Sequence, residues 1–299
     1  MSVANTTPDI PAPVAEPKKP DHILPAGSCD CHAHIFGPAE RYPYAAERDY
    51  TPHDAPLSMY AGLLHHLGFS RAVLVQASVY GTDNSQMADA LEAAKSEPHG
   101  IEWRGIAVLP ESVSDAELER LNGLGVRGAR LNLLNKGAGL SFDDVKALAD
   151  RLAPLDWHLQ FLIDISTFAD FRGRMSRLPV TSVIDHIGHF PGQLGPQSAG
   201  FQDLLALVRE GRTWVKVSGP NRFARQPVPP YDDAVPLTEA LVEAAPDQLV
   251  FGTDWPHVRL KTPMPDDGAL VDEFMRWIGN DAAIAQRILV DNPARLYGF

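Results

Sequence analysis

Eight apolar runs of strand length recur along the chain, and segments with helical periodicity lie between them. The runs cover residues 28–36, 72–78, 103–109, 128–134, 158–164, 181–188, 213–219 and 248–255. Between them, apolar residues recur at the i, i+3, i+4 spacing of an amphipathic helix in residues 84–95, 115–124, 142–152 and 201–209. Strands that alternate with helices build parallel sheets, and eight such units close into a barrel. The sequence therefore predicts an α/β protein with a (β/α)8 TIM-barrel fold.

The length and composition fit a single barrel domain with one short extension. With 299 residues, of which 44% are hydrophobic and 21% charged, the chain can bury one full barrel core. The first residues are rich in Pro, Ala and Thr and lack periodicity. We therefore expect a flexible arm over residues 1–24 and the barrel over residues 25–299.

The formal net charge of −12 bears on partners and location. An acidic protein is repelled by nucleic acid and by an anionic membrane surface, so neither is expected as a partner. No apolar run reaches the length of a membrane span, and the first residues lack the basic and apolar regions of a signal peptide, which favours the cytoplasm. A monomer or a small homo-oligomer is expected.

The first predicted strand carries two histidines in the segment CDCHAHIFG. Side chains two residues apart on a strand point to the same face, so His32 and His34 are expected side by side. Alternation puts Asp30 on the same face, toward the barrel interior. The same alternation places Cys29, Cys31 and Ala33 on the opposite face, toward the surrounding helices. The alternative is one buried, hydrogen-bonded histidine beside a surface one, without a chemical role.

Further polar residues stand at the carboxyl ends of the predicted strands. These residues are Asp185 and His186 toward the end of strand six, Asp254 at the end of strand eight, and Arg130 and Asn132 on strand four. The loops that follow barrel strands converge on one rim, where barrel enzymes place their chemistry. We therefore expect these residues and the two histidines to form one site.

Seven segments carry a resemblance to a known family: DCHAHIFG, VLVQASVYGTDN, VRGARLNLL, VIDHIGH, VFGTDWPH, PDDGALVD and the terminal NPARLYGF. The chain resembles the amidohydrolase superfamily, whose pattern is HxH on strand one, a histidine on strand six and an aspartate on strand eight. More closely, it is similar to the branch of 2-pyrone-4,6-dicarboxylate lactonase and 4-sulfomuconolactone hydrolase. This similarity extends from about residue 25 to residue 299.

The resemblance implies a carboxylic-ester hydrolase that opens the ring of a small anionic lactone, as in the catabolism of aromatic compounds. It implies that Asp254 acts as the general base on the attacking water, since an ionised carboxylate accepts a proton. It further implies that His32, His34 and His186 polarise the lactone carbonyl and stabilise the oxyanion. For these four residues, buried hydrogen-bonded histidines or a structural ion pair are the alternative.

The metal content is open at this point. A two-metal site of this superfamily needs a lysine or glutamate on strand four and a histidine at the end of strand five. Here strand four has Arg130 and Asn132 and strand five ends in LID, so a binuclear site is not expected. One Zn²⁺ with an open water position would take three ligands, namely His32, His34 and Asp254. The lactonase resemblance implies no required cofactor and the sulfomuconolactone relative implies zinc. We favour metal-independent hydrolysis.

Cationic residues near the predicted rim indicate an anionic substrate. Arg130, Arg222 and Lys136 are expected there, and a guanidinium pairs well with a carboxylate. For Lys136 and Arg222, solvated loop charges are the alternative. Tyr50 matches a substrate-contacting tyrosine of the lactonase pattern. The expected substrate-binding residues are Tyr50, Ser78, Arg130, Asn132, His189 and Arg222.

The chain departs from the lactonase pattern at three positions. Lys136 and His189 stand where the pattern has arginines, and Leu162 stands where it has a tyrosine. A site that pairs two carboxylates discriminates strongly when those partners change, because buried charges left unpaired are costly. We therefore expect a related lactone with one carboxylate, a sulfonate or a more apolar ring face.

Two other functions remain open. One is another reaction on the same barrel, namely a metal-dependent decarboxylation or hydration, or the hydrolysis or isomerisation of a sugar-acid lactone. The other is a binding protein without catalytic activity. The joint presence of His32, His34, His186 and Asp254 argues against the latter, since an inactive site has no chemical need for all four.

Overall fold

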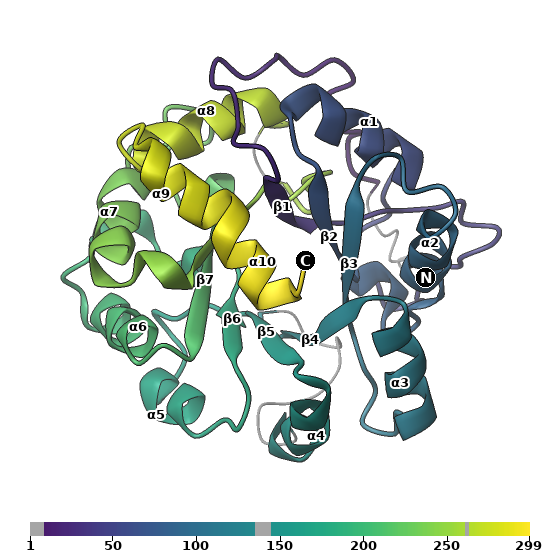
Figure 1. Ribbon diagram of the computed structural model, residues 1–299. Coiled ribbons are helices and arrows are strands. Elements are labelled where there is room, and N and C mark those ends of the chain that lie inside the picture. Colours follow the sequence, from purple (N-terminus) through teal and green to yellow (C-terminus); the bar gives the residue numbers. More distant parts are fainter. Residues whose placement is uncertain (1–8, 135–144, 261–262) are drawn as a thin grey trace, which may run out of the picture.

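The structure is a computed structural model that describes residues 9–134, 145–260 and 263–299. Within these residues, eight strands form one sheet in the order β1 to β8, and all neighbouring pairs are parallel. Beyond the last strand, the amide of Asp254 donates to the carbonyl of His32 at 2.8 Å, and the amide of His34 donates to that of Trp255 at 2.8 Å. These bonds join the two edges of the sheet. The predicted (β/α)8 barrel is confirmed (Figure 1).

The strands coincide with the eight predicted runs, but each of them ends earlier. They are β1 (Cys29–Ala33), β2 (Arg71–Val75), β3 (Glu102–Ala107), β4 (Val126–Asn132), β5 (His158–Leu162), β6 (Ser182–Ile184), β7 (Thr213–Ser218) and β8 (Leu249–Gly252). The sixth strand differs most, because the chain turns at once into a short 3-10 segment at His186–His189. Apolar side chains continue past the turns, which is why the sequence pattern placed the strand ends too late.

Helices cover the outside of the strands (Figure 1). They are α1 (Leu57–Leu67), α2 (Ser85–Ala94), α3 (Asp115–Gly123), α4 (Val145–Leu152), α5 (Phe171–Ser176), α6 (Ala199–Arg209), α7 (Ala234–Ala244), α8 (Asp267–Trp277), α9 (Ala282–Gln286) and α10 (Asn292–Tyr297). α2, α3, α4 and α6 match the four predicted helical segments, of which residues 142–144 lie outside the described residues. Among the residues that the structure describes, none of the helices combines the length and the apolar character needed to cross a membrane.

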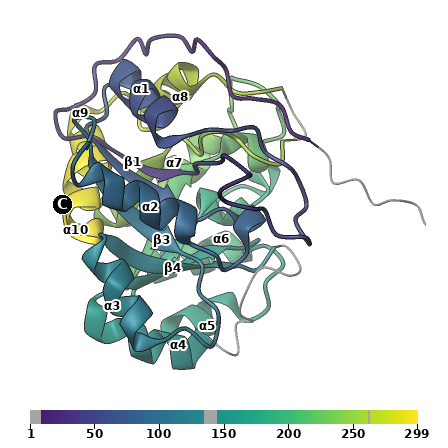
Figure 2. The ribbon, with the colours of Figure 1, turned by 90° about the vertical axis from the view of Figure 1, so that its right-hand side faces the viewer.

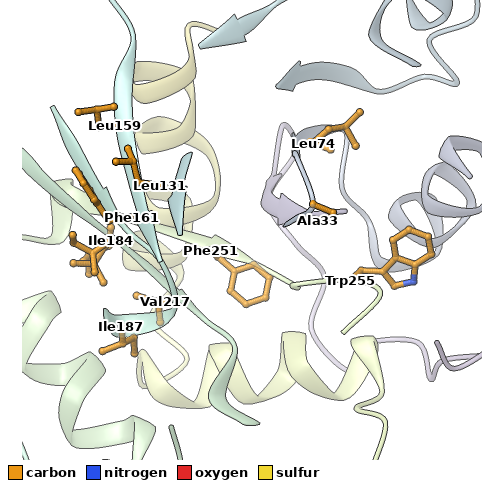
Figure 3. Packing of buried hydrophobic residues seen from close by; sticks show 14 of the residues in the cluster. Ala33, Leu74, Leu131, Leu159, Phe161, Ile184, Ile187, Val217, Phe251 and Trp255 are labelled. Carbon is orange, nitrogen blue, oxygen red and sulfur yellow. The ribbon is translucent and has the colours of Figure 1, made fainter. Parts of the chain in front are cut away.

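The main apolar core lies between the strands and the helices. Outward side chains of adjacent strands meet there, as Leu131 of β4, Phe161 of β5 and Ile184 of β6 do (Figure 3). The helices add their apolar stripes, and α6 buries Leu204 and Leu205 in this layer. Full burial of one such side chain stabilises the fold by about 1.5–3 kcal/mol. This layer holds the strand ends in the positions that form the rim.

The first strand does not present the faces that alternation predicted. Cys29 and Cys31 lie inside the barrel, in a second apolar cluster with inward residues of other strands and with Tyr297 of α10. α10 crosses that end of the barrel (Figure 1). Asp30 points outward instead, where its carboxylate accepts hydrogen bonds from the amide and the hydroxyl of Thr253 at 2.9 and 2.6 Å. The predicted orientations of these two cysteines and of Asp30 are therefore wrong.

A β-bulge explains the difference. The register between β1 and β2 shifts between Asp30 and Ala33, and an extra residue in one strand reverses the alternation beyond it. Past the bulge, Ala33 packs toward the helices as predicted, while His32 and His34 face inward. The bulge therefore lets a strand that begins with two inward cysteines end with two inward histidines.

Residues 9–24 of the predicted arm form neither helix nor strand beyond a single bridge at Asp9, and they pass along α8 (Figure 2). The amide of Lys18 donates to the carboxylate of Asp266 at 2.8 Å, and that of Asp21 donates to Asp272 at 2.9 Å. These contacts attach the segment to the barrel surface. The division of the chain at residue 24 stays a prediction.

Candidate active site

A cavity of about 280 Å³ opens at the carboxyl ends of the strands. Its walls include nearly all residues that the sequence predicted for the site: His34, Tyr50, Ser78, Arg130, Asn132, His186, His189, Arg222 and Asp254. His32 lies beneath the cavity, with its ring centre 5.1 Å from that of His34 and 4.6 Å from that of His186. Lys136, also predicted near the rim, lies outside the described residues.

Short turns directly after the strands carry several of these side chains. Ser78 begins such a turn after β2, His186 begins one after β6, and Arg222 ends one after β7. The backbones of His186, His189 and Asp254 are left-handed, with φ of 51°, 47° and 67°. For residues other than glycine, this conformation costs about 1–3 kcal/mol and concentrates at functional sites. These three strained residues all line the cavity.

Asp254 is buried at the base of the cavity. One carboxylate oxygen, Oδ2, accepts from Nε of Arg222 at 2.6 Å and also contacts the Nη2 of the same guanidinium. The other oxygen, Oδ1, lies 3.7 Å from Nε2 of His32 and 3.6 Å from Nε2 of His186. Within the described residues it has no hydrogen-bond partner. Burial raises the pKa of Asp254, and the charge of Arg222 opposes that rise.

Four histidines near Asp254 are held in the neutral form by burial: His32, His34, His186 and His189. Burial lowers the pKa of His34 and of His189 to about 3, and it lowers the pKa of His32 and of His186 well below the usual value. In a neutral imidazole one nitrogen donates and the other accepts. Nδ1 of His34 lies 2.7 Å from the carbonyl oxygen of Val75, which can only accept. The proton of His34 is therefore on Nδ1, and its Nε2 is an acceptor.

A fully buried lysine lies below the histidines. Lys216 of β7 donates to the carbonyl of Cys31 at 2.7 Å and to Oε1 of Gln160 at 2.8 Å, and its Nζ is 3.3 Å from Nδ1 of His32. Asp185 lies 3.6 Å from the same Nζ. Burial favours the neutral acid, but the charges of Lys216 and of a neighbouring arginine outweigh it and hold the pKa of Asp185 below its usual value. An ion pair thus supports the site from within the barrel.

The sequence reasoning missed two cationic residues, Lys216 and Arg259. The sequence could have indicated Lys216, because it is the only charged residue in the strand TWVKVS. Arg259 lines the cavity, and its Nη1 lies 2.7 Å from Oδ2 of Asp49. The sequence could have indicated Arg259 as well, because it lies five residues after Asp254, in the loop that follows β8. The cavity wall also includes Leu134, Leu162, Asn221, Val258 and Leu260.

Two groups of buried side chains bring together atoms that could hold a metal ion. They are His32, His34 and Asp254, and His32, Asp185 and His186, with the ligand atoms of each group within 4.8 Å of one another. In the first group, His34 offers an acceptor nitrogen and Asp254 an unpaired oxygen, judged over the described residues. This group, which the sequence predicted, fits one divalent ion when the proton of His32 lies on Nδ1.

Comparisons with known proteins agree with this architecture. The model of the family described as Amidohydrolase matches residues 29–299. A 2-pyrone-4,6-dicarboxylate hydrolase of Comamonas testosteroni is 40% identical over 292 residues, covering 95% of this chain and 94% of that protein. A 4-sulfomuconolactone hydrolase of Rhizobium radiobacter is 36% identical over 280 residues, covering 92% of this chain and 91% of that protein.

A solved structure shows the same fold. It is a crystal structure, with citric acid bound, of an Acinetobacter baumannii protein to which 2-pyrone-4,6-dicarboxylic acid hydrolysis is ascribed. The TM-score is 0.79 at 25% identity, and the match covers 91% of this chain and 100% of that chain. The chain therefore belongs to the amidohydrolase family. The predicted superfamily and the hydrolase class are confirmed.

Proposed function

We propose that the protein hydrolyses a small lactone that carries an anionic group, of the 2-pyrone carboxylate or muconolactone type. The observation that carries this proposal is the geometry of Asp254. Its unpaired carboxylate oxygen lies 3.7 and 3.6 Å from two neutral histidines, at the base of a cavity whose described wall includes arginines. The two relatives named as hydrolases of a pyrone dicarboxylate and of a sulfomuconolactone support the same substrate class.

Asp254 serves as the general base in this proposal. Arg222 donates a hydrogen bond to Oδ2 of Asp254, and this bond fixes the orientation of the carboxylate and therefore the position of Oδ1. A water molecule at that oxygen loses its proton to Asp254 as it attacks the lactone carbonyl carbon. The tetrahedral intermediate then collapses by breaking the bond between this carbon and the ring oxygen. Asp254 returns the proton to the ring oxygen as this oxygen leaves, and the new carboxylic acid at the former carbonyl ionises to a carboxylate.

His32 and His186 stabilise the oxyanion. Nδ1 of His32 lies 3.3 Å from both Nζ of Lys216 and Oδ1 of Asp185, and in this proposal it accepts from the lysine. The hydroxyl of Ser218, 2.9 Å from Nδ1 of His186, can donate in the same way. Both rings then carry their proton on Nε2, where it can donate to the developing charge. His34 was expected to stabilise the oxyanion, but a different role is proposed for it here. Its Nε2 accepts, so it orients the attacking water instead.

Arg130 binds the anionic group of the substrate. Its hydrogen bonds within the protein are long, at 3.4 Å to Asp185 and 3.5 Å to the carbonyl of Gln76. The guanidinium can therefore turn donors toward a carboxylate or a sulfonate, which it pairs with in a fork geometry. The other proposed substrate contacts are Tyr50, Ser78, Asn132, His189 and Arg222.

Hydrolysis proceeds without a metal cofactor in this proposal. A bound Zn²⁺ would take His32, His34 and Asp254 as ligands, and such an ion lowers the pKa of a water molecule and polarises a carbonyl. The surroundings oppose it for two reasons. Arg222 already neutralises Asp254, and the hydrogen bond from Lys216 keeps the proton of His32 on the nitrogen that a metal would need.

The test is hydrolysis of a panel of lactones followed by ultraviolet absorbance. The panel contains 2-pyrone-4,6-dicarboxylate, muconolactones with a carboxylate or a sulfonate, and sugar-acid lactones, and D254N is the matched inactive control. Turnover of a pyrone or muconolactone by the wild type, lost in D254N, supports the proposal. No turnover across the panel contradicts it and favours a metal-dependent decarboxylation or hydration on the same barrel.

A further inference from the structure

We propose that His257 is a positioning residue for Asp254: its hydrogen bond to Asp267 anchors the turn that carries Asp254 to the first turn of α8. The role in catalysis rests on the proposed function, in which Asp254 is the general base. His257 follows Asp254 by three residues and is buried. It is not one of the described residues that line the cavity, so it acts through Asp254 and not on the substrate.

The turn after β8 runs from Asp254 to His257. The amide of His257 donates to the carbonyl of Asp254 at 2.8 Å, which closes the turn. Both residues have left-handed backbones, with φ of 67° and 63°. Residues other than glycine keep this conformation only where the surrounding structure enforces it. The position of the Asp254 carboxylate therefore depends on what holds the two ends of the turn.

The beginning of the turn is held by β1. The amide of Asp254 donates to the carbonyl of His32 at 2.8 Å, and the preceding residue, Thr253, donates twice to the buried carboxylate of Asp30. These bonds belong to the seam between β8 and β1. They fix where the turn starts, but they leave its other end to a different contact.

The end of the turn is held by the side chain of His257. Its Nε2 lies 2.9 Å from Oδ1 of Asp267, and neither side chain is exposed to solvent. Burial disfavours the protonated ring, but Asp267 outweighs this effect and raises the pKa of His257. The proton on Nε2 therefore points at the carboxylate, and the hydrogen bond is strengthened by charge.

The partner of His257 belongs to a rigid element. Asp267 is the first residue of α8, where a carboxylate is favoured by the helix dipole. The preceding residue, Asp266, caps the helix by accepting from the amide of Ala269 at 2.9 Å. The same helix buries Leu270 and Phe274 in the main core. The bond from His257 thus ties the turn to a helix that is itself fixed.

Stability does not account well for this pair. Nδ1 of His257 and Oδ2 of Asp267 are buried and have no hydrogen-bond partner among the described residues. Two apolar side chains of similar volume often stabilise a fold as much as a buried pair of this kind, because they avoid its desolvation. What apolar side chains do not supply is a directed contact at one distance. The pair therefore fits a role in placing the turn.

Steady-state kinetics with 2-pyrone-4,6-dicarboxylate test the role in catalysis. In H257L, kcat should fall by about 10- to 100-fold while KM changes by less than about threefold, since the residues that bind the substrate are untouched. H257Q should recover most of kcat, because the amide nitrogen of glutamine can donate to Asp267 from nearly the same place. A loss through KM alone, or equal losses in H257L and H257Q, overturns the inference.

A double variant separates positioning from the cost of an unpaired charge. H257L leaves Asp267 buried without its partner, and this alone can destabilise the protein, whereas H257L/D267L removes both groups. Thermal unfolding of the double variant should return toward that of the wild type. Its kcat should stay as low as in H257L, because both variants lack the same hydrogen bond. A double variant with the kcat of the wild type overturns the inference.

The matched control is another pair of histidine and aspartate on the same helix. Nδ1 of His22 lies 2.9 Å from Oδ1 of Asp272 on α8, but this contact joins the helix to residues 9–24 and not to the turn. H22L should therefore keep kcat within about twofold of the wild type. A loss in H22L as large as that in H257L would assign the effect to α8 in general and overturns the inference.

Hydrogen exchange separates the anchor from the proposed function, since it needs no substrate. In H257L/D267L, the amides of residues 253–258 should exchange about tenfold or more faster than in the wild type, while those of β4 and β5 keep their rates. If the turn is loosened in this way but the wild type hydrolyses no lactone, the proposed function fails and the anchor stands. Unchanged exchange in the turn overturns the anchor whatever the turnover.

Discussion

The proposed chemistry depends most on Asp254. In D254N the amide nitrogen cannot accept a proton from water, while the side chain keeps its shape. We expect kcat to fall by about 10²- to 10⁴-fold. Circular dichroism and thermal unfolding should stay close to those of the wild type. D150N, which changes an exposed carboxylate paired with Lys146 on α4, is the matched control and should keep full activity. A D254N protein with most of its activity would contradict the general-base role.

The pH dependence of activity follows from the same residue. Burial raises the pKa of Asp254, and the reaction needs the ionised form. Activity should therefore be lost as pH falls through a pKa that lies above the usual value for aspartate. His32, His34 and His186 should not contribute a transition near neutrality, since burial lowers their pKa values. Against the effect of burial, the pKa of His257 is raised by its partner Asp267, so a transition of His257 is independent of Asp254 as the base and should persist in D254N. The profile of kcat/KM against pH checks both points. An acid limb of the wild type at the usual pKa of an aspartate, or one that is unchanged in D254N, would contradict the role of Asp254.

Lys216 is expected to matter for stability as well as for activity. In K216M the carboxylate of Asp185 loses the ammonium 3.6 Å away, and both side chains are fully buried. Removing one partner of a buried ion pair costs about 3–5 kcal/mol of the free energy of unfolding. The double variant K216M/D185N removes both charges and should recover a large part of that loss. Urea unfolding of the three proteins tests this, and no recovery in the double variant would show that Lys216 stabilises through its other contacts.

At the scale of elements, the contact between β1 and β8 positions His32. A side chain at Gly252 of β8 would place its Cβ 2.6 Å from Cβ and 2.8 Å from the backbone nitrogen of His32. G252A should therefore displace the end of β1, lower the free energy of unfolding by about 1–3 kcal/mol and reduce kcat. G123A at the end of α3 is the control, because no atom lies within 4 Å of its added Cβ. Equal effects of the two variants would contradict the role of this contact.

The elements show why some predictions succeeded and others failed. Apolar runs and helical periodicity are local properties, so they located the strands and several helices. The faces of β1 were wrong because a bulge between Asp30 and Ala33 changes the alternation, and nothing in the local pattern marks it. The strand ends were placed too late, since buried side chains continue into turns such as His186–His189.

At the scale of the whole molecule, the chain carries a net charge of −12 while the described wall of its cavity is cationic. This arrangement concentrates positive charge where the proposed anionic substrate would bind, and that charge disfavours a divalent cation. We expect protein purified without added metal to contain far less than one Zn²⁺ per chain and to keep its activity in EDTA. Elemental analysis and the chelator assay check this. Stoichiometric zinc, with activity lost in EDTA and restored by zinc, would contradict metal-independent hydrolysis. The cytoplasmic location and the size of the assembly stay predictions.

The sequence by itself determined the barrel, the family, and the residue types that gather at its rim. Those features follow from local periodicity and from short motifs around His32, His186 and Asp254. Only the tertiary structure decided which other side chains contact these residues. Lys216 of β7 reaches His32 of β1, and Arg222 after β7 reaches Asp254 after β8. Such relations depend on register and closure, which join residues far apart in the chain, so no local pattern encodes them.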